Sequence, residues 1–126
     1  MAGLTLDVGA LIDVERRGLR MMTLAKRARQ RKQTLTVPAG VLAQVWRGDR
    51  SVRLAQFLHG CEVEPLTEER AKNVGQLLAR SGTSDVIDAS VVVSAASRGD
   101  AIVTSDPDDM RRLTAHQPGV AAVLTV

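Results

Sequence analysis

Short apolar runs alternate along this chain with longer stretches in which apolar residues recur every three or four positions. The apolar runs are rich in Val, Ile, Leu and Thr and end at polar residues, glycine or proline, which is typical of buried strands. The longer stretches have the spacing and the start and stop signals of helices. The pattern therefore predicts strands at residues 3–8, 34–38, 61–66, 101–105 and 119–126, and helices from Gly9 onward and at 39–48, 51–60, 67–82, 84–99 and 107–116.

The order of these elements predicts the fold class. Strands that alternate with helices are joined by right-handed crossovers and form parallel sheets that are covered on both faces. We therefore expect a three-layer α/β/α sandwich around a mainly parallel sheet of about five strands. The chain has 126 residues and no low-complexity linker, so one domain over residues 1–126 is expected.

Three aspartates are predicted to meet at one edge of this sheet. Asp7 ends the first strand, Asp106 follows the strand at 101–105, and Asp88 lies in the first turn of the helix at 84–99. The strands of a parallel sheet all end at the same edge, where the following helices begin and where open α/β folds bind ligands. Neighbouring carboxylates repel one another unless a divalent cation neutralises them, and ligands that are all oxygen favour Mg²⁺ or Mn²⁺.

Each acid also has a purely structural interpretation. Asp106 is followed by a proline and, at the third helical position, by Asp109, which is a normal helix start, and Asp85 has the position of an N-cap. Capping explains Asp7 and Asp88 less well. Asp7 interrupts an apolar segment, and the helix that contains Asp88 already has Asp85 as its N-cap. The coincidence of three acids at one edge favours the metal site.

Composition limits the other kinds of site. Cys61 is the only cysteine, which excludes an internal disulfide, and one thiol with two distant histidines, His59 and His116, does not make a zinc cage. The N-terminal stretch lacks a basic leader, and Asp7 and Asp13 interrupt its apolar run, so neither a signal peptide nor a membrane span is expected. We expect a cytoplasmic protein.

Charge is unevenly distributed along the chain. The net charge is +3, yet residues 1–60 contain 11 Lys and Arg and 4 Asp and Glu, whereas residues 61–126 contain 6 and 10. A basic segment beside an acidic cluster suits a polyanion held near a metal site. We therefore predict phosphate contacts from Arg16, Arg17 and Arg20. A solvated basic helix face explains the charge of this segment equally well.

A family resemblance is carried by four segments, LDVGALI (6–12), VLAQVWRG (41–48), TSDVIDASVV (83–92) and AIVTSDPDDMRRL (101–113). In this order and spacing they resemble the PIN-domain ribonucleases, in particular the VapC-type toxins of toxin–antitoxin pairs. The resemblance implies Mg²⁺-dependent endoribonuclease activity on RNA, a homodimer, and a cognate antitoxin that blocks the site. Carried over by position, Asp7, Asp88 and Asp106 match the family's catalytic, metal-binding acids.

The chain departs from this family at two points. Gln44 stands where the family usually has a glutamate, which removes one negative charge, although an amide oxygen can still ligate a metal or hold its water. The small hydroxyl residue that often follows the first acid is absent from residues 8–10. Asp85, three residues before Asp88, is expected to restore some charge, so the candidate additional site residues are Gln44, Asp85 and Asp109.

The reaction expected from these residues is hydrolysis of an RNA phosphodiester by water, activated by one or two metal ions, without a side-chain nucleophile. The alternative is a catalytically weakened PIN-like module that binds RNA or a protein partner without cutting, and Gln44 keeps this alternative open. Receiver-like and phosphatase-like domains also gather aspartates around Mg²⁺. They are disfavoured because Val8 and Gly9 follow the first strand and no lysine occurs after Lys72.

Overall fold

The structure, a computed structural model, describes residues 2–48 and 51–126. Five strands form one sheet in the order β3-β2-β1-β4-β5, and all four neighbouring pairs are parallel. The strands are β1 (Leu4–Leu6), β2 (Leu35–Pro38), β3 (Glu62–Glu64), β4 (Ala101–Thr104) and β5 (Val123–Thr125). The predicted parallel sheet of five strands is confirmed.

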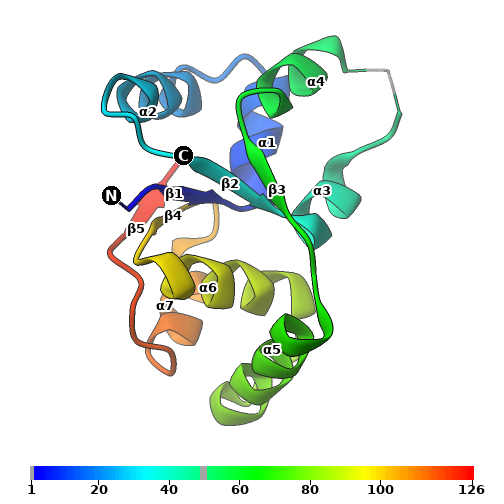
Figure 1. Ribbon diagram of the computed structural model, residues 1–126, viewed down its shortest axis with the longest axis vertical. Coiled ribbons are helices and arrows are strands. Elements are labelled where there is room, and N and C mark those ends of the chain that lie inside the picture. Colours follow the sequence, from blue (N-terminus) through cyan, green and yellow to red (C-terminus); the bar gives the residue numbers. More distant parts are fainter. Residues whose placement is uncertain (1, 49–50) are drawn as a thin grey trace.

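Helices cover both faces of the sheet (Figure 1). In the view of Figure 1, α1, α2 and α4 lie above the sheet, α5 to α7 lie below it, and α3 lies at the right, where β2 ends, so the predicted three-layer sandwich is confirmed. The helices are α1 (Val8–Glu15), α2 (Leu19–Gln30), α3 (Ala39–Val45), α4 (Val52–Leu58), α5 (Glu68–Ser81), α6 (Val86–Arg98) and α7 (Pro107–Thr114).

The largest difference from the sequence prediction is α2, which lies in the basic segment where the pattern delimits no helix. The helix buries Met21, Ala25 and Ala28 against the core. Two of these three residues are alanines, so the apolar face is weak beside the many cationic side chains of the segment. At the other end of the chain, the predicted strand at 119–126 shortens to β5, because only these residues pair with β4.

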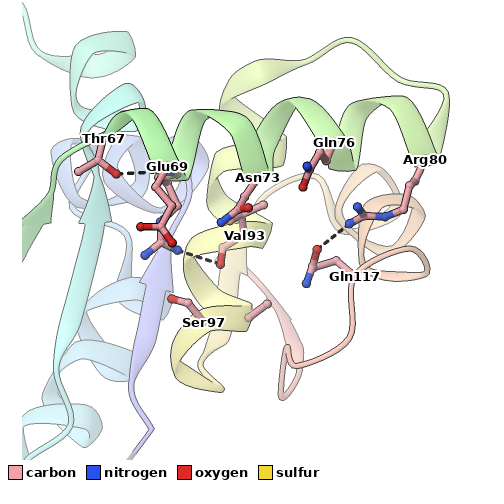
Figure 2. Close-up of a pocket in the computed structure, with 10 residues that line it drawn as sticks. Thr67, Glu69, Asn73, Gln76, Arg80, Val93, Ser97 and Gln117 are labelled. Carbon is pink, nitrogen blue, oxygen red and sulfur yellow. Dashed lines mark hydrogen bonds between the residues drawn. The ribbon is translucent and has the colours of Figure 1, made fainter.

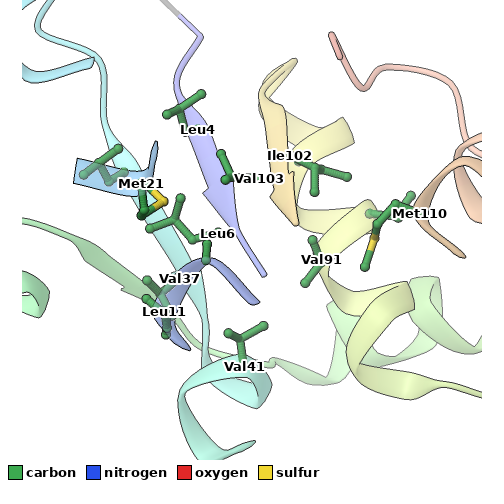
Figure 3. Packing of buried hydrophobic residues seen from close by; sticks show 14 of the residues in the cluster. Leu4, Leu6, Leu11, Met21, Val37, Val41, Val91, Ile102, Val103 and Met110 are labelled. Atoms are coloured by element: carbon green, nitrogen blue, oxygen red, sulfur yellow. The ribbon is translucent and has the colours of Figure 1, made fainter. Parts of the chain in front are cut away.

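The core consists of two apolar layers, one on each side of the sheet, because successive strand residues point to opposite faces. Figure 3 shows Leu6 near Leu11 of α1 on one side, and Ile102 near Val91 of α6 and Met110 of α7 on the other. All five side chains are fully buried, and each such burial contributes about 1.5–3 kcal/mol. These layers fix the ends of β1 and β4.

A network of charged and hydroxyl groups lies beside the amino-terminal ends of β1 and β4. Arg98 donates to Asp100 (Nε to Oδ2, 2.9 Å), to the Thr5 hydroxyl (3.0 Å) and to the Ser94 hydroxyl (2.7 Å), and it forms an ion pair with Glu64. The backbone N–H of Gly3 and the Thr5 hydroxyl also donate to Asp100. We name this network the Arg98 cluster, and it comprises Thr5, Glu64, Arg70, Ser94, Arg98 and Asp100.

Within the described residues, no helix is both long enough and apolar enough to cross a membrane.

Candidate active site

The strand order creates a topological switch point at the carboxyl ends of β1 and β4, which we name the β1–β4 crevice. From β1 the chain continues into α1 on one face of the sheet, and from β4 it continues into α7 on the other face. In open α/β sheets, this reversal of direction at the carboxyl ends of two neighbouring strands is where ligands bind. Asp7 directly follows β1, and Asp106 lies two residues after the end of β4.

Asp7 is held rigidly in this crevice. It is buried and occupies the N-cap position of α1, where its Oδ1 accepts from the backbone N–H of Val8 (2.7 Å) and its Oδ2 accepts from the Thr104 hydroxyl (2.7 Å). Burial raises the pKa of Asp7, the two hydrogen bonds lower it, and the charges of Asp106 and Asp85 raise it further. The carboxylate therefore has a fixed position and an unfavourable charge.

Thr104 joins the two strand-end acids. Its hydroxyl donates to Asp7 and accepts a hydrogen bond from the backbone N–H of Asp106 (3.0 Å). Thr104 is not among the site residues predicted from the sequence. Its only signal is its place two positions before Asp106, and the contact depends on the register that pairs Leu6 with Val103.

Asp88 lies in the first turn of α6, beside the N-cap residue Asp85. The Asp85 side chain accepts from the backbone N–H of Asp88 (2.9 Å), so the predicted capping role of Asp85 is confirmed. Partial burial raises the pKa of Asp88, and the charges of Asp7, Asp85, Asp109 and Asp106 raise it further, from its ordinary value of 3.8 to about 7. The carboxylates of three chain segments are thus close enough to repel one another.

Asp106 occupies the N-cap position of α7, and Pro107 is the first helical residue, as predicted. Its side chain, however, makes no capping hydrogen bond, so a capping role for this carboxylate is wrong. The backbone of Asp106 (φ −120°, ψ 69°) is the physical reason, because it departs from the extended geometry in which an N-cap side chain reaches back to the helix. The exposed carboxylate is available for other contacts.

A pocket of about 320 Å³ lies between the start of α6 and α7. Its lining residues are Gly82, Thr83, Ser84, Asp85, Asp88, Asp109, Arg112 and Leu113. Asp109 therefore shares a pocket with Asp85 and Asp88. Arg112 is the second residue beside the acids that the sequence analysis did not single out, because an exposed arginine on an amphipathic helix has no distinguishing sequence signal.

The acids of this edge lack cationic partners. In the described ranges, no Lys, Arg or His nitrogen lies within 4.0 Å of the carboxylates of Asp7, Asp85, Asp88, Asp106 or Asp109. Donors that are all oxygen and carry uncompensated charge fit a hard divalent cation such as Mg²⁺ or Mn²⁺. Residues 2–48 and 51–126 nevertheless contain no group of three or more Asp, Glu, His or Cys side chains assembled to hold a metal ion.

Of the predicted basic contacts, Arg16 and Arg20 lie near the carboxyl ends of β4 and β5, and the three residues differ from one another. Arg16 is exposed and lines a separate pocket of about 250 Å³ together with Gly9 and Ser105, next to Asp106 in the chain. Arg17 is exposed at a positive φ of 61°. Arg20 donates from Nε to the backbone carbonyl of Thr125 (2.8 Å), which ties α2 to the end of β5.

Gln44 is exposed on α3, and within the described residues no hydrogen bond joins it to an acid. It lies one helical turn after Gly40, where an added Cβ would be 3.7 Å from Ile87 and 3.9 Å from Ser90 of α6. Residues four positions apart share a face of a helix, so Gln44 is on the side of α3 that packs against α6. Its role at the acidic edge stays a prediction.

Figure 2 shows a different pocket, of about 460 Å³, between α5 and α6. It contains only one acid, Glu69, and shares no lining residue with the pocket of Asp88. Its arginines are already engaged, since Arg70 donates to the carbonyl of Val93 and Arg80 donates to Gln117. This pocket lacks the concentration of uncompensated charge found at the carboxyl edge.

Comparison with known proteins agrees with this geometry. Residues 5–115 match the family model of the PIN domain. A crystal structure of VapBC2 from Rickettsia felis, bound to a DNA fragment from its promoter, has a similar fold, with a TM-score of 0.75 at 14% identity over 98% of each chain. DNA-bound VapBC from Salmonella typhimurium gives a TM-score of 0.69 at 20% identity, over 99% of this chain and 98% of that one. A search of curated protein sequences found no match.

Proposed function

The chain belongs to the PIN domain family, and we propose that it is a cytoplasmic Mg²⁺-dependent endoribonuclease of the VapC toxin type. The observation that carries this proposal is the group of acids at the β1–β4 crevice: the pKa values of Asp7 and Asp88 are raised, and no acid of the group has a cationic partner within 4.0 Å among the described residues. Such a group is unfavourable for folding unless it binds a cation. The presence of these destabilising acids is explained if they bind a metal ion for a reaction.

In the proposed reaction, Asp7, Asp88 and Asp106 would hold Mg²⁺ or Mn²⁺. When bound, the cation supplies Lewis acidity, which favours deprotonation of water and offsets the charge that develops on the phosphate. The oxygen of water forms a bond to phosphorus, the bond from phosphorus to one ribose oxygen breaks, and that oxygen takes up a proton. The Thr104 hydroxyl holds the Asp7 carboxylate in one position during these steps.

The basic residues near the site would bind the RNA backbone. Arg16 is best placed, because its pocket is shared with Ser105, the neighbour of Asp106 in the chain. Phosphate contacts of this kind position a substrate without reading its sequence. Arg17 and Arg20 are candidates for the same role farther from the acids.

An antitoxin and a second copy of the chain are the proposed protein partners. The outer face of α2 supports a protein contact, because Leu19 is 83% exposed and Met22 43% exposed on an open surface that also carries Lys26 and Arg29. Exposed apolar side chains beside cations suit an amphipathic acidic segment. The two similar solved structures are VapBC assemblies.

The proposal is tested by incubating structured RNA with the protein in Mg²⁺, in Mn²⁺ and with EDTA. Cleavage is expected only with a divalent cation, and Asp106→Asn is expected to abolish it. Asp108→Asn is the matched control, because Asp108 is an exposed acid on the same helix that pairs with Arg111 and does not line the acidic pocket. Equal cleavage by wild type and Asp106→Asn would contradict the proposal.

The second candidate function is a module that binds RNA or a protein without cutting. It is favoured by Gln44 in place of an acid and by the lack, among the described residues, of an assembled group of metal ligands. RNA binding without cleavage in either Mg²⁺ or Mn²⁺ would support this candidate against the nuclease.

A further inference from the structure

Arg112 is the one cationic side chain among the residues that line the pocket of Asp85, Asp88 and Asp109. Arg112 and Asp109 lie three positions apart on α7, so their Cβ atoms are about 5–6 Å apart on one face of the helix. Arg112 is exposed. Over residues 2–48 and 51–126, no ion pair or hydrogen bond engages its guanidinium, whereas the adjacent Arg111 pairs with Asp108. Arg112 is thus free to bind a ligand.

The charge of this pocket depends on what is bound there. Three carboxylates and one guanidinium leave a formal charge of two negative units, which repels an RNA phosphate. A divalent cation held at Asp88 offsets part of this negative charge, and the guanidinium then becomes the attractive group of the pocket. An arginine at such a position can bind two phosphate oxygens at once.

We propose that Arg112 binds the RNA phosphate next to the scissile one, so that the pocket between α6 and α7 is a phosphate subsite of the active site. This inference rests on the proposed function. The pocket volume of about 320 Å³ is at the lower end of the range of small-ligand pockets, which suits a single nucleotide. The exposed hydroxyl residue Ser84 lies in the same pocket and is a neutral partner for the phosphate or ribose.

The test measures binding of a fluorescent single-stranded RNA with cleavage-resistant phosphorothioate linkages, in Mg²⁺ and in EDTA, over a series of salt concentrations. In Mg²⁺, Arg112→Gln is expected to weaken binding about tenfold and to flatten the slope of log affinity against log salt by about 0.7. Arg112→Lys should retain part of the affinity, because lysine keeps the charge but not the paired donors. In EDTA, Arg112→Gln should change binding less than twofold.

Arg111→Gln is the matched control, since it removes the same charge from the next position of α7, outside the pocket. It is expected to change affinity less than twofold in both conditions. Equal losses of RNA affinity for the two variants would contradict the proposed subsite. An equal loss of affinity for Arg112→Gln in Mg²⁺ and in EDTA would contradict it as well. Steady-state cleavage of unmodified RNA separates the two proposals, because a wild type that binds but never cuts contradicts the nuclease function and leaves the binding test of Arg112 intact.

Discussion

Asp7 and Asp100 are two buried aspartates, 4% and 2% exposed, at opposite ends of the central strands. Asp100 accepts from two neutral donors and from the guanidinium of Arg98, so the protein itself neutralises its charge. Within the described residues, Asp7 accepts hydrogen bonds only from Val8 and Thr104, and the charges that act on it are those of Asp106 and Asp85. The charge of the buried Asp100 is thus neutralised by Arg98 at one end of the sheet. At the other end, no cationic side chain of the described residues neutralises the charge of Asp7.

We interpret this difference as the contrast between an acid that stabilises the fold and an acid that serves the proposed reaction. A buried carboxylate is tolerated when hydrogen bonds and an opposite charge compensate its lost hydration. The Arg98 cluster satisfies this condition within the chain and connects α5, β3, α6 and the residue that precedes β4. Asp7 has hydrogen bonds but no cationic partner among the described residues, and acids with perturbed pKa values of this kind concentrate at functional sites.

The strongest test of this contrast makes the same substitution, aspartate to asparagine, at both ends of the sheet and compares its effects on cleavage and on stability. Asp7→Asn is expected to reduce RNA cleavage at least about a thousandfold and to leave the metal-free protein equally or more stable, because carboxylate repulsion is relieved. Asp100→Asn is expected to cost about 2–4 kcal/mol of unfolding free energy, because Arg98 loses its buried partner. Urea denaturation and RNA cleavage measure both effects. A loss of stability in both variants would remove the contrast.

The sequence predicts the fold and the meeting of the strand-end acids because both follow from element order. Once Asp7 and Asp106 follow parallel strands, the topology leaves them little freedom, whatever the details of packing. The Thr104 bridge requires the register of β1 against β4, and the position of Arg112 requires the packing of α7 against α6. Neither relation is encoded in the spacing of residues along the chain, so the sequence alone does not reveal them.

The pH dependence of stability in EDTA gives the second test. A carboxyl group with a raised pKa stabilises the folded state fully below its unfolded pKa near 3.8, and this contribution is lost as the pH rises through about 7. Unfolding free energy is therefore expected to fall by about 1–2 kcal/mol between pH 4 and pH 8, less than the full shift implies because Asp88 is partly exposed. Asp7, whose pKa is also raised, acts in the same direction.

Asp88→Asn should flatten this pH profile, and adding Mg²⁺ to wild type should flatten it as well, because the cation favours the charged form. Asp108→Asn, which removes an acid outside the crevice, should leave the profile unchanged. A profile of wild type that rises between pH 4 and pH 8 would contradict the assignment of uncompensated acids to this edge. Denaturation curves at fixed ionic strength supply the measurement.

The third test concerns the fit between α1 and the loop after β4. A methyl group added at Gly9 would lie 2.9 Å from the backbone nitrogen of Ser105 and would also collide with its side chain, so Gly9→Ala must displace the residue next to Asp106. Cleavage is expected to fall about tenfold, because metal ligands tolerate little displacement. Gly75→Ala is the control, since no atom lies within 4 Å of its added methyl group, and it should stabilise α5 by about 0.5–1 kcal/mol. Full activity of Gly9→Ala would show that this loop is adaptable.

The smallest expected effect comes from Gln44, which stands where the family usually has a glutamate. Because Gln44 shares a face of α3 with Gly40, which packs against the start of α6, Gln44→Glu should add a further negative charge near Asp88. The Mg²⁺ concentration that gives half-maximal cleavage is then expected to fall about two- to fivefold, since one partly exposed charge contributes up to about 1 kcal/mol. Gln76→Glu adds the same charge on α5, in the pocket of Figure 2, and should change nothing. Identical metal titrations for Gln44→Glu and wild type would place Gln44 outside the site, and the uncompensated charge of the crevice would then belong to its aspartates alone.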